Sequence, residues 1–257
     1  ESVKRFHPWI FSGAIQSFSG QPREGEVVKV LSYEGETLGE GHWHNGSIAV
    51  RLLLFGDGRV DRDFFINRIE KALRLRSQMG IAGGKGITAW RLIHGEGDNL
   101  PGLVIDVYND TFVIQAHSYG MYLSLEDISD ALSAIFGNKL SAIYSKSSST
   151  LTIKPENPLE DKYIQGLSES PAIILESGKK FLVDWINGQK TGFFLDQRDN
   201  RALVEKYSKG RRVLNLFSYT GGFSVYALAG GALSVDSVDS SRTVGDIIAK
   251  NTELNKD

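Results

Sequence analysis

The feature that most constrains the fold is a strand, a glycine turn, a helix and a second strand that follow one another and end on an acid. Val213 to Phe217 is a short apolar run, and Tyr219-Thr220-Gly221-Gly222 comes almost directly after it. A helical pattern then runs to Gly230-Gly231, and Ala232 to Val238 has the composition of a second strand before Asp239. This order is typical of the start of a nucleoside-binding α/β domain.

The residues at the two strand ends indicate which nucleoside is bound. In open α/β sheets the ligand lies at the carboxyl ends of the strands, so Thr220 to Gly222 and Asp239 are expected to face one ligand. The carboxylate of Asp239 can accept hydrogen bonds from both ribose hydroxyls of NAD or of S-adenosylmethionine. A pyrophosphate needs the spacing G-x-G-x-x-G, whereas Asn215, Ser218 and Thr220 stand where the early glycines would be. Asn215 and Thr220 suit a cofactor with an amino acid tail and no phosphate. The alternative is that Gly221-Gly222 only allows close helix packing.

Several long strings resemble one known family. They are GQKTGFFLDQR at 188–198, LNLFSYTGGFSVYA at 214–227 and VDSS at 238–241, together with RFHPWIFSGAI at 5–15 and EGDNLPGLVIDVYND at 96–110. These strings resemble the class I S-adenosylmethionine-dependent methyltransferases of large-subunit ribosomal RNA, the group that includes the 23S rRNA 5-methylcytosine enzyme with an N-terminal PUA domain. The resemblance covers essentially the whole chain. It implies S-adenosylmethionine as the cofactor, large-subunit ribosomal RNA as the partner and a cytoplasmic location.

The predicted cofactor site combines the strand ends with a segment that the resemblance adds. By resemblance, Lys190 to Arg198 closes over the methionine end of the cofactor, while Asp239 holds the ribose. The expected cofactor contacts are Phe194, Asp196, Gln197, Arg198, Asn215, Phe217, Tyr219, Thr220, Gly221, Gly222, Asp239 and Ser240. Core packing is an equal alternative for Phe193 and Phe194.

The charge of the chain does not indicate a dedicated nucleic-acid binder, because its formal net charge is −2. RNA contacts must therefore come from local basic patches. The patches are Lys4-Arg5 near Trp9, a helix with Arg68, Lys71, Arg74 and Arg76, and the group Lys190, Arg198 and Arg201. Each patch also fits a solvated face without a ligand. The residues expected to contact RNA are Lys4, Arg5, Trp9, Lys190 and Arg201.

Composition excludes several other classes. No apolar run approaches the length of a membrane span, and 41% hydrophobic residues are ample for a globular fold. The sequence has no cysteine, which excludes disulfides and thiolate metal sites within it and fits a cytoplasmic location. His42 and His44 alternate on one predicted strand, but no third ligand lies nearby, so no metal is expected.

Turn signals predict a multi-domain α/β protein with four segments. Residues 1–60 form a small β-barrel, and 61–86 form a linker helix and glycine hinge. The resemblance implies that the barrel is a PUA-like domain that docks RNA, and the alternative is a purely structural barrel. Residues 87–178 form a central α+β domain, and 179–257 start a Rossmann-like, doubly wound domain, which the resemblance implies is the methyltransferase domain. The expected strands are Val27–Ser32, Leu38–Trp43, Ile48–Leu54, Leu103–Tyr108, Phe112–His117, Ala142–Lys146, Ile173–Glu176 and Phe181–Trp185. The expected helices are Asp61–Met79, Leu123–Phe136 and Ser241–Asn255. Residues 147–170 are expected to be an exposed loop.

The doubly wound segment is short for a domain of this kind, which leads to an expectation of truncation. On the order of a hundred residues are expected to be missing, by typical domain size. The chain is then an incomplete, inactive fragment, and the catalytic residues lie downstream of Asp257.

The target base stays open at this point. Cytosine C5 is the base that the resemblance favours, but its methylation needs a thiolate, and no cysteine is present. A guanine nitrogen could be methylated by positioning alone. The alternatives are therefore a guanine-directed enzyme and an RNA-binding protein that keeps the fold without catalysis. A nucleotide-linked oxidoreductase is disfavoured by the missing pyrophosphate glycines. The oligomeric state also stays open, with a homodimer as one option.

Overall fold

The computed structural model describes residues 2–151, 159–241 and 244–256 of the 257-residue chain. The chain divides into two compact units. The first joins Glu1–Gln78 to Arg91–Ser168, and the second joins Met79–Trp90 to Glu169–Asp257. This division groups residues differently from the four predicted segments, whose boundaries stay a prediction. Among the residues that the model describes, no helix combines the length and the apolar character that crossing a bilayer would need.

The first unit begins with a four-stranded antiparallel sheet in the order β1-β4-β3-β2. Its strands are β1 (Trp9–Phe11), β2 (Val27–Leu31), β3 (Thr37–Trp43) and β4 (Ile48–Phe55). The last three confirm the predicted strands to within one residue at each end, whereas β1 is too short to show an alternating pattern. A side chain at Gly41 would place its Cβ 2.2 Å from the carbonyl oxygen of Arg51, so only glycine allows the close approach of β3 to β4 there.

A second, mixed sheet in the order β5-β6-β7-β8-β9 follows in the chain. Its strands are β5 (Ala89–His94), β6 (Leu103–Tyr108), β7 (Thr111–Ala116), β8 (Ala142–Ser145) and β9 (Lys162–Gln165). The pair β7 and β8 is parallel, and β6–β7 and β8–β9 are antiparallel. The prediction of a loop over 147–170 is wrong at β9, where Tyr163 packs edge-on against Tyr144 with ring centroids 4.9 Å apart. The rest of that stretch includes residues 152–158, which lie outside the described part.

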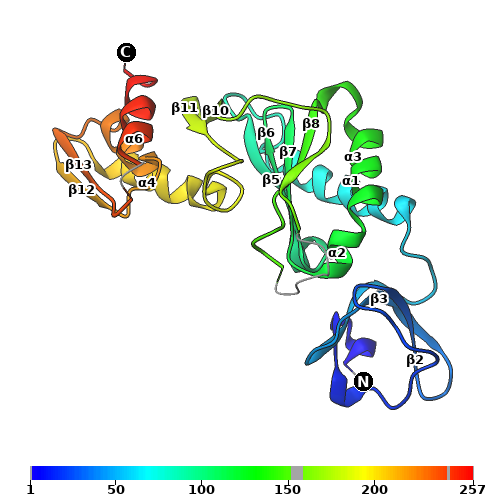
Figure 1. Cartoon of the computed structure of the whole chain (residues 1–257). Helices are drawn as coiled ribbons and strands as arrows, with labels where there is room; N and C mark the ends of the chain where they lie inside the picture. The colour runs from blue at the N-terminus through cyan, green and yellow to red at the C-terminus, as the bar shows by residue number, and fades with distance from the viewer. Residues whose placement is uncertain (1, 152–158, 242–243, 257) are drawn as a thin grey trace. The chain divides into compact units, whose positions relative to one another are not determined.

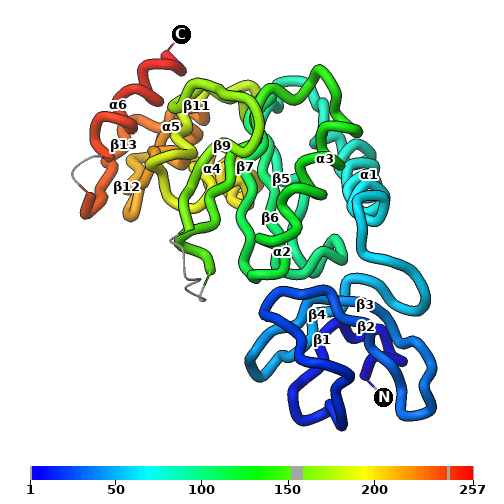
Figure 2. The backbone as a smooth tube through the Cα atoms, turned by 45° about the vertical axis from the view of Figure 1, so that its right-hand side comes forward, coloured from blue at the N-terminus to red at the C-terminus, as the bar shows by residue number. Residues whose placement is uncertain are grey.

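Helices α1 (Arg62–Gln78), α2 (Tyr119–Leu123) and α3 (Leu125–Phe136) complete the first unit. α1 and α3 pack side by side, as Figures 1 and 2 both show. α1 buries Phe65, Ile69 and Ala72, which are spaced four and three residues apart and so lie on one face. Each large apolar side chain buried in this way contributes on the order of 1.5–3 kcal/mol. The predicted helix Asp61–Met79 is confirmed with its ends one residue shorter.

The second unit contains the predicted strand-turn-helix-strand motif. β12 (Arg212–Leu216) and β13 (Ser234–Val238) pair in parallel, and α5 (Gly222–Ala229) connects them. The predicted hairpin is β10 (Ala172–Glu176) with β11 (Lys179–Val183). Helix α6 (Val244–Glu253) packs against α5 and β11 (Figure 2). A further helix, α4 (Arg198–Tyr207), packs against α5 and was not predicted.

Candidate cofactor site at the ends of β12 and β13

The carboxylate of Asp239 follows the end of β13 and is fixed by main-chain hydrogen bonds. Its Oδ1 accepts a hydrogen bond of 2.9 Å from the N–H of Ser241, and its Oδ2 accepts one of 2.9 Å from the N–H of Tyr219. These two bonds, with that from Ser241 the larger cause, hold the pKa of Asp239 below its usual value. The side chain is therefore anionic at neutral pH. Each carboxylate oxygen can accept more than one hydrogen bond, so both can also bind ligand hydroxyls.

The turn between β12 and α5 has an unusual backbone. Phe217 has φ 55°, Tyr219 has φ 45° and Gly221 has φ 74°, so two residues with a Cβ adopt the left-handed conformation that favours glycine. The N–H of Ser218 bonds the carbonyl of Val238 at 3.1 Å, which ties the turn to β13. Strained backbone of this kind costs of order 1–3 kcal/mol per residue and clusters at functional sites.

The side chain of Tyr219 joins this turn to the loop before α4. Its hydroxyl accepts a hydrogen bond from the N–H of Gln189 at 2.9 Å and donates one to the carbonyl of Gly192 at 3.1 Å. Its ring meets that of Phe194 edge-on, with centroids 5.3 Å apart. Burial raises the pKa of Tyr219, so the hydroxyl keeps its proton. Two parts of the predicted site, the strand end and the segment around Phe194, therefore meet at Tyr219.

The same loop is fixed at its start by Asp184. Its Oδ1 accepts hydrogen bonds from the N–H groups of Ile186 and Asn187, both at 2.9 Å, and from the hydroxyl of Ser170 at 3.0 Å. Burial alone would raise the pKa of Asp184, but the hydrogen bonds from Asn187, Ser170 and Ile186 together outweigh it and lower the pKa. The charged form of Asp184 thus holds the loop that Tyr219 binds.

Three of the predicted cofactor contacts bind other parts of the protein. The amide of Gln197 donates to Asp196 at 3.1 Å, and both lie in a short 3-10 turn before α4. The guanidinium of Arg198 donates to the carbonyl of Ala89 at 2.6 Å and lies 3.6 Å from Glu176. Within the described part of the chain, the hydrogen bonds and ion pairs of these three residues do not connect them to Asp239 or to the turn around Tyr219.

Arg201 requires a correction. It was predicted to contact RNA, but only 3% of the residue is exposed, and it forms two hydrogen bonds of 2.7 Å to Glu176, which is fully buried. Its guanidinium also donates to the carbonyl of Phe194 at 3.0 Å and lies over the ring of Phe193, 4.6 Å from the centroid. A buried guanidinium that is already paired with a carboxylate cannot bind an RNA phosphate at the surface. Arg201 instead holds the segment that carries Phe194.

Asn215 binds within the sheet and helix layer. Its amide donates to the hydroxyl of Ser224 on α5 at 2.8 Å, and that hydroxyl shares a hydrogen bond of 2.7 Å with Ser237 on β13. The side-chain carbonyl of Asn215 remains an acceptor that a ligand could use.

The glycine pair has a clear packing role. A Cβ on Gly221 would lie 3.1 Å from the side chain of Ile248 on α6, and one on Gly222 would lie 3.1 Å from that of Arg201. Close helix packing, the alternative considered for these glycines, is therefore part of their purpose. Their contact with a cofactor stays a prediction. Of the neighbouring predicted contacts, Thr220 is buried, Phe217 is 90% exposed, and Ser240 is exposed.

Sequence reasoning missed two residues at this site. The hydroxyl of Ser218 is buried and has no hydrogen-bond partner among the described residues. Asn251 on α6 is fully buried, donates to the carbonyl of Thr220 at 2.8 Å and accepts from the N–H of Leu182 at 2.7 Å. The sequence could have indicated that Asn251 is buried. It stands seven residues after Val244 and so lies on the same apolar face of α6.

The remaining predicted RNA contacts are distributed over both units. In the first unit, Lys4 is exposed and pairs with Glu36 at 3.5 Å, Arg5 is exposed, and Trp9 is half-buried. In the second unit, Lys190 is exposed. The two histidines considered as metal ligands have other roles: His44 bonds Glu24 at 2.6 Å, and His42 is buried. Within the described residues no group of three potential ligands lies together.

Comparisons with known proteins identify both ends of the chain. Residues 154–257 match the family model of S-adenosylmethionine-dependent methyltransferases, and residues 1–55 match that of the PUA-like domain. Ribosomal RNA large subunit methyltransferase I of Aeromonas salmonicida is 42% identical over 260 residues, covering 99% of this chain and 64% of that protein. The Vibrio cholerae protein of the same name is 40% identical with the same coverage.

Solved structures agree with this family. A methyltransferase from Streptococcus mutans described as S-adenosylmethionine-dependent superposes with a TM-score of 0.82 at 26% identity, covering 99% of this chain and 64% of that one. A methyltransferase structure in complex with SAH gives the same values.

The chain therefore combines a PUA-like domain with an S-adenosylmethionine-dependent methyltransferase domain. It is similar over nearly its whole length to ribosomal RNA large subunit methyltransferase I. The chain spans 64% of the length of these curated relatives. This coverage does not confirm the expectation of an inactive fragment.

Proposed function

We propose that this chain belongs to an enzyme that binds S-adenosylmethionine at the ends of β12 and β13 and methylates a base of large-subunit ribosomal RNA. The observation that carries the proposal is the placement of Asp239. Its carboxylate is held anionic by the N–H groups of Ser241 and Tyr219, beside a turn whose backbone is strained. A carboxylate at this edge of a parallel sheet is the group that binds ribose hydroxyls.

The residues present fit such a cofactor. The buried hydroxyl of Ser218, without a partner in the described part of the chain, can bind a polar ligand beside Asp239. The loop that Tyr219 holds provides Phe194 on the other side of the turn. The cofactor supplies a methyl group bonded to a sulfonium, and the chain must align the acceptor with that methyl group. The other predicted contacts are part of the same proposal: Asp196, Gln197, Arg198, Asn215, Phe217, Thr220, Gly221, Gly222 and Ser240.

The RNA substrate is proposed from similarity, since the relatives are named for large-subunit ribosomal RNA and residues 1–55 match a PUA-like domain. Cytosine C5 is the favoured target. Methylation at cytosine C5 depends on a thiolate that adds to the base. The 257 residues contain no cysteine, so the thiolate would come from outside them. A guanine-directed enzyme is the second candidate, because a guanine nitrogen needs no covalent activation. An RNA-binding protein without catalysis is the third.

Two measurements test the proposal. Isothermal calorimetry of this chain with S-adenosylmethionine and with SAH should show saturable binding, and its absence with both ligands would reject the cofactor site. For the reaction, a protein of the relatives' full length would be incubated with large-subunit ribosomal RNA and a methyl-labelled cofactor. Mass spectrometry of the digested RNA should then show 5-methylcytosine. Methylguanine would instead support the second candidate, and unmodified RNA with intact cofactor binding would support the third.

A further inference from the structure

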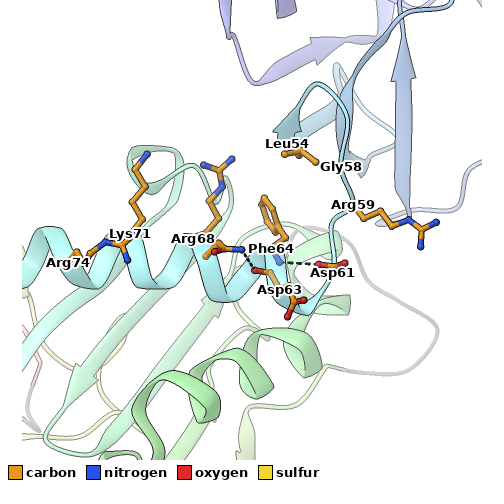
Figure 3. A pocket seen from close by; sticks show the side chains of 10 residues that line it. Leu54, Gly58, Arg59, Asp61, Asp63, Phe64, Arg68, Lys71 and Arg74 are labelled. Carbon is orange, nitrogen blue, oxygen red and sulfur yellow. Dashed lines mark hydrogen bonds between the residues drawn. The ribbon is translucent and has the colours of Figure 1, made fainter.

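A basic groove lies in the first unit, apart from the cofactor site. It has a volume of about 500 Å³ and lies between the end of β4 with its following loop and helix α1 (Figure 3). Leu54 and Phe64 provide its apolar part. Arg68 and Lys71 extend from α1 on the same side as Phe64, Arg74 lies further along the helix, and Arg59 belongs to the linker before it.

Helix geometry explains why α1 presents this stripe. Phe64, Arg68 and Lys71 are four and three residues apart, so they lie on one face. The face that packs in the core carries Phe65 and Ile69, which are fully buried. α1 therefore has an apolar face that stabilises the fold and a separate basic face along the groove.

The groove is cationic although the chain is not. Its lining holds four cationic side chains and two carboxylates, Asp61 and Asp63, for a net charge of +2, whereas the whole chain has −2. The carboxylate of Asp61 is also engaged locally, since it accepts a hydrogen bond of 3.0 Å from the N–H of Phe64 at the start of α1. A concave surface with an excess of one charge sign attracts ligands of the opposite charge.

The cations of the groove differ in how firmly they are held. The guanidinium of Arg68 lies 5.2 Å from the centroid of the Phe64 ring and donates to the carbonyl of Leu53 at 3.1 Å, so it is oriented before any ligand binds. Arg74 forms an exposed ion pair with Glu70 at 3.6 Å, which contributes little to stability. Lys71 is exposed and has no ion pair within the described ranges.

Arg76, the fourth cation in the basic patch of this helix, does not belong to the groove. Its guanidinium pairs with Asp98, and both side chains are almost buried. Of the basic patch that the sequence predicts on this helix, Arg68, Lys71 and Arg74 therefore line the groove, and Arg76 does not.

We propose that this groove binds the phosphate backbone of RNA, with Arg68 as the oriented donor and Lys71 and Arg74 as adaptable cations. The proposal rests on the proposed function and adds the part of the chain that holds the RNA. Phe64 is only 8% exposed, so its ring is not available to stack on a base. Contacts of this kind position the RNA without reading its sequence.

The test compares two double variants of this chain. Lys71→Gln/Arg74→Gln removes two groove cations from exposed positions, and Arg62→Gln/Lys162→Gln removes one arginine and one lysine from exposed positions outside the groove lining. Fluorescence anisotropy would follow a labelled large-subunit ribosomal RNA fragment and a scrambled RNA of equal length at several salt concentrations. The groove variant should bind both RNAs about tenfold more weakly, and its log-affinity against log-salt slope should fall by about 1.5. The control should match the wild type.

The outcomes separate this proposal from the proposed function. Equal affinity and salt slope for the groove variant and the control would overturn the groove, while calorimetry on the same proteins shows independently whether the cofactor site stands. Tighter binding of poly-glutamate than of RNA at matched charge would assign the groove to an acidic protein and also overturn it. So would inorganic phosphate that displaces the RNA at submillimolar concentration, which would indicate a site for a small anion.

Discussion

The N–H of Tyr219 donates a hydrogen bond of 2.9 Å to Oδ2 of Asp239, and this bond connects the turn after β12 to the acid after β13. The donor is a residue with a left-handed φ of 45°. The strained turn thus aims a main-chain donor at a side chain twenty positions later. The same tyrosine holds the loop of Gln189 and Gly192 through its hydroxyl. One residue therefore positions two segments of the cofactor site.

Replacing Asp239 with alanine should weaken the binding of S-adenosylmethionine at least about tenfold, because two hydrogen bonds to the ribose would be lost. Calorimetry would measure the change. Asp236→Ala is the matched control, since Asp236 is an exposed acid on β13 itself. It should change the affinity less than about twofold. Equal affinities for the Asp239→Ala variant and the wild type would remove Asp239 from the site.

Replacing Tyr219 with phenylalanine should loosen the loop while the ring contact with Phe194 remains. The loss of two hydrogen bonds should destabilise the loop by about 1–3 kcal/mol. Hydrogen–deuterium exchange should then be faster at the main-chain N–H of Gln189, which donates a hydrogen bond to the Tyr219 hydroxyl in the wild type. Tyr207→Phe is the control, because Tyr207 is 62% exposed, and exchange around Gln189 should not change in it. Unchanged exchange in both variants would contradict the role given to the Tyr219 hydroxyl.

The motif around β12 and β13 could be predicted from the sequence because each of its signals is local. The apolar run, the glycine turn and the acid follow one another, and the parallel pairing of Val213 with Val235 agrees with them. The hairpin of β10 and β11 was predictable for the same reason. In the first unit, β2, β3 and β4 alternate regularly enough to be found.

What could not be predicted depends on partners far apart in the chain. Arg201 stands in a polar segment and suggests a surface cation, yet its partner Glu176 lies 25 residues earlier at the end of an apolar strand. No local pattern indicates that the two meet in the core. Three strands were missed: β1 and β9, which have three and four residues and too little periodicity, and β5, which buries four of its six residues without strict alternation.

Replacing Glu176 with glutamine should destabilise the protein by about 3–5 kcal/mol, because Arg201 would keep its charge in the core without a counter-charge. The hydroxyl of Tyr226 also donates to Oε1 of Glu176 at 3.1 Å, and glutamine offers only one acceptor oxygen to the donors of Arg201 and Tyr226. Urea unfolding would measure the free energy. Glu36→Gln is the control: Glu36 pairs with Lys4 on the surface, and its loss should cost less than about 0.5 kcal/mol. Similar costs for the two variants would show that the buried pair is not needed for stability.

Acid should destabilise the first unit through His42. This residue is 3% exposed, and its Nε2 lies 3.3 Å from the hydroxyl of Ser124. Burial lowers the pKa of His42 from 6.5 to about 4, and the charge of Arg51 has a smaller effect in the same direction. Between these two values the unfolded chain binds a proton that the folded chain does not. The contribution of neutral His42 is therefore complete above pH 6.5 and is lost as the pH falls toward 4, by about 3 kcal/mol in total.

Urea unfolding between pH 7 and pH 4 would test this expectation. The free energy of unfolding should fall with pH in the wild type and fall less in His42→Gln, whose side chain does not titrate. The lowered carboxylates Asp184 and Asp239 also begin to lose their contributions as the pH approaches their usual pKa of 3.8, but this loss is the same in the wild type and in His42→Gln, so the difference between the two curves isolates His42. His7→Gln is the control, since His7 is exposed, and it should keep the pH dependence of the wild type. Parallel curves for the wild type and His42→Gln would mean that His42 is protonated in the folded protein as readily as in the unfolded chain.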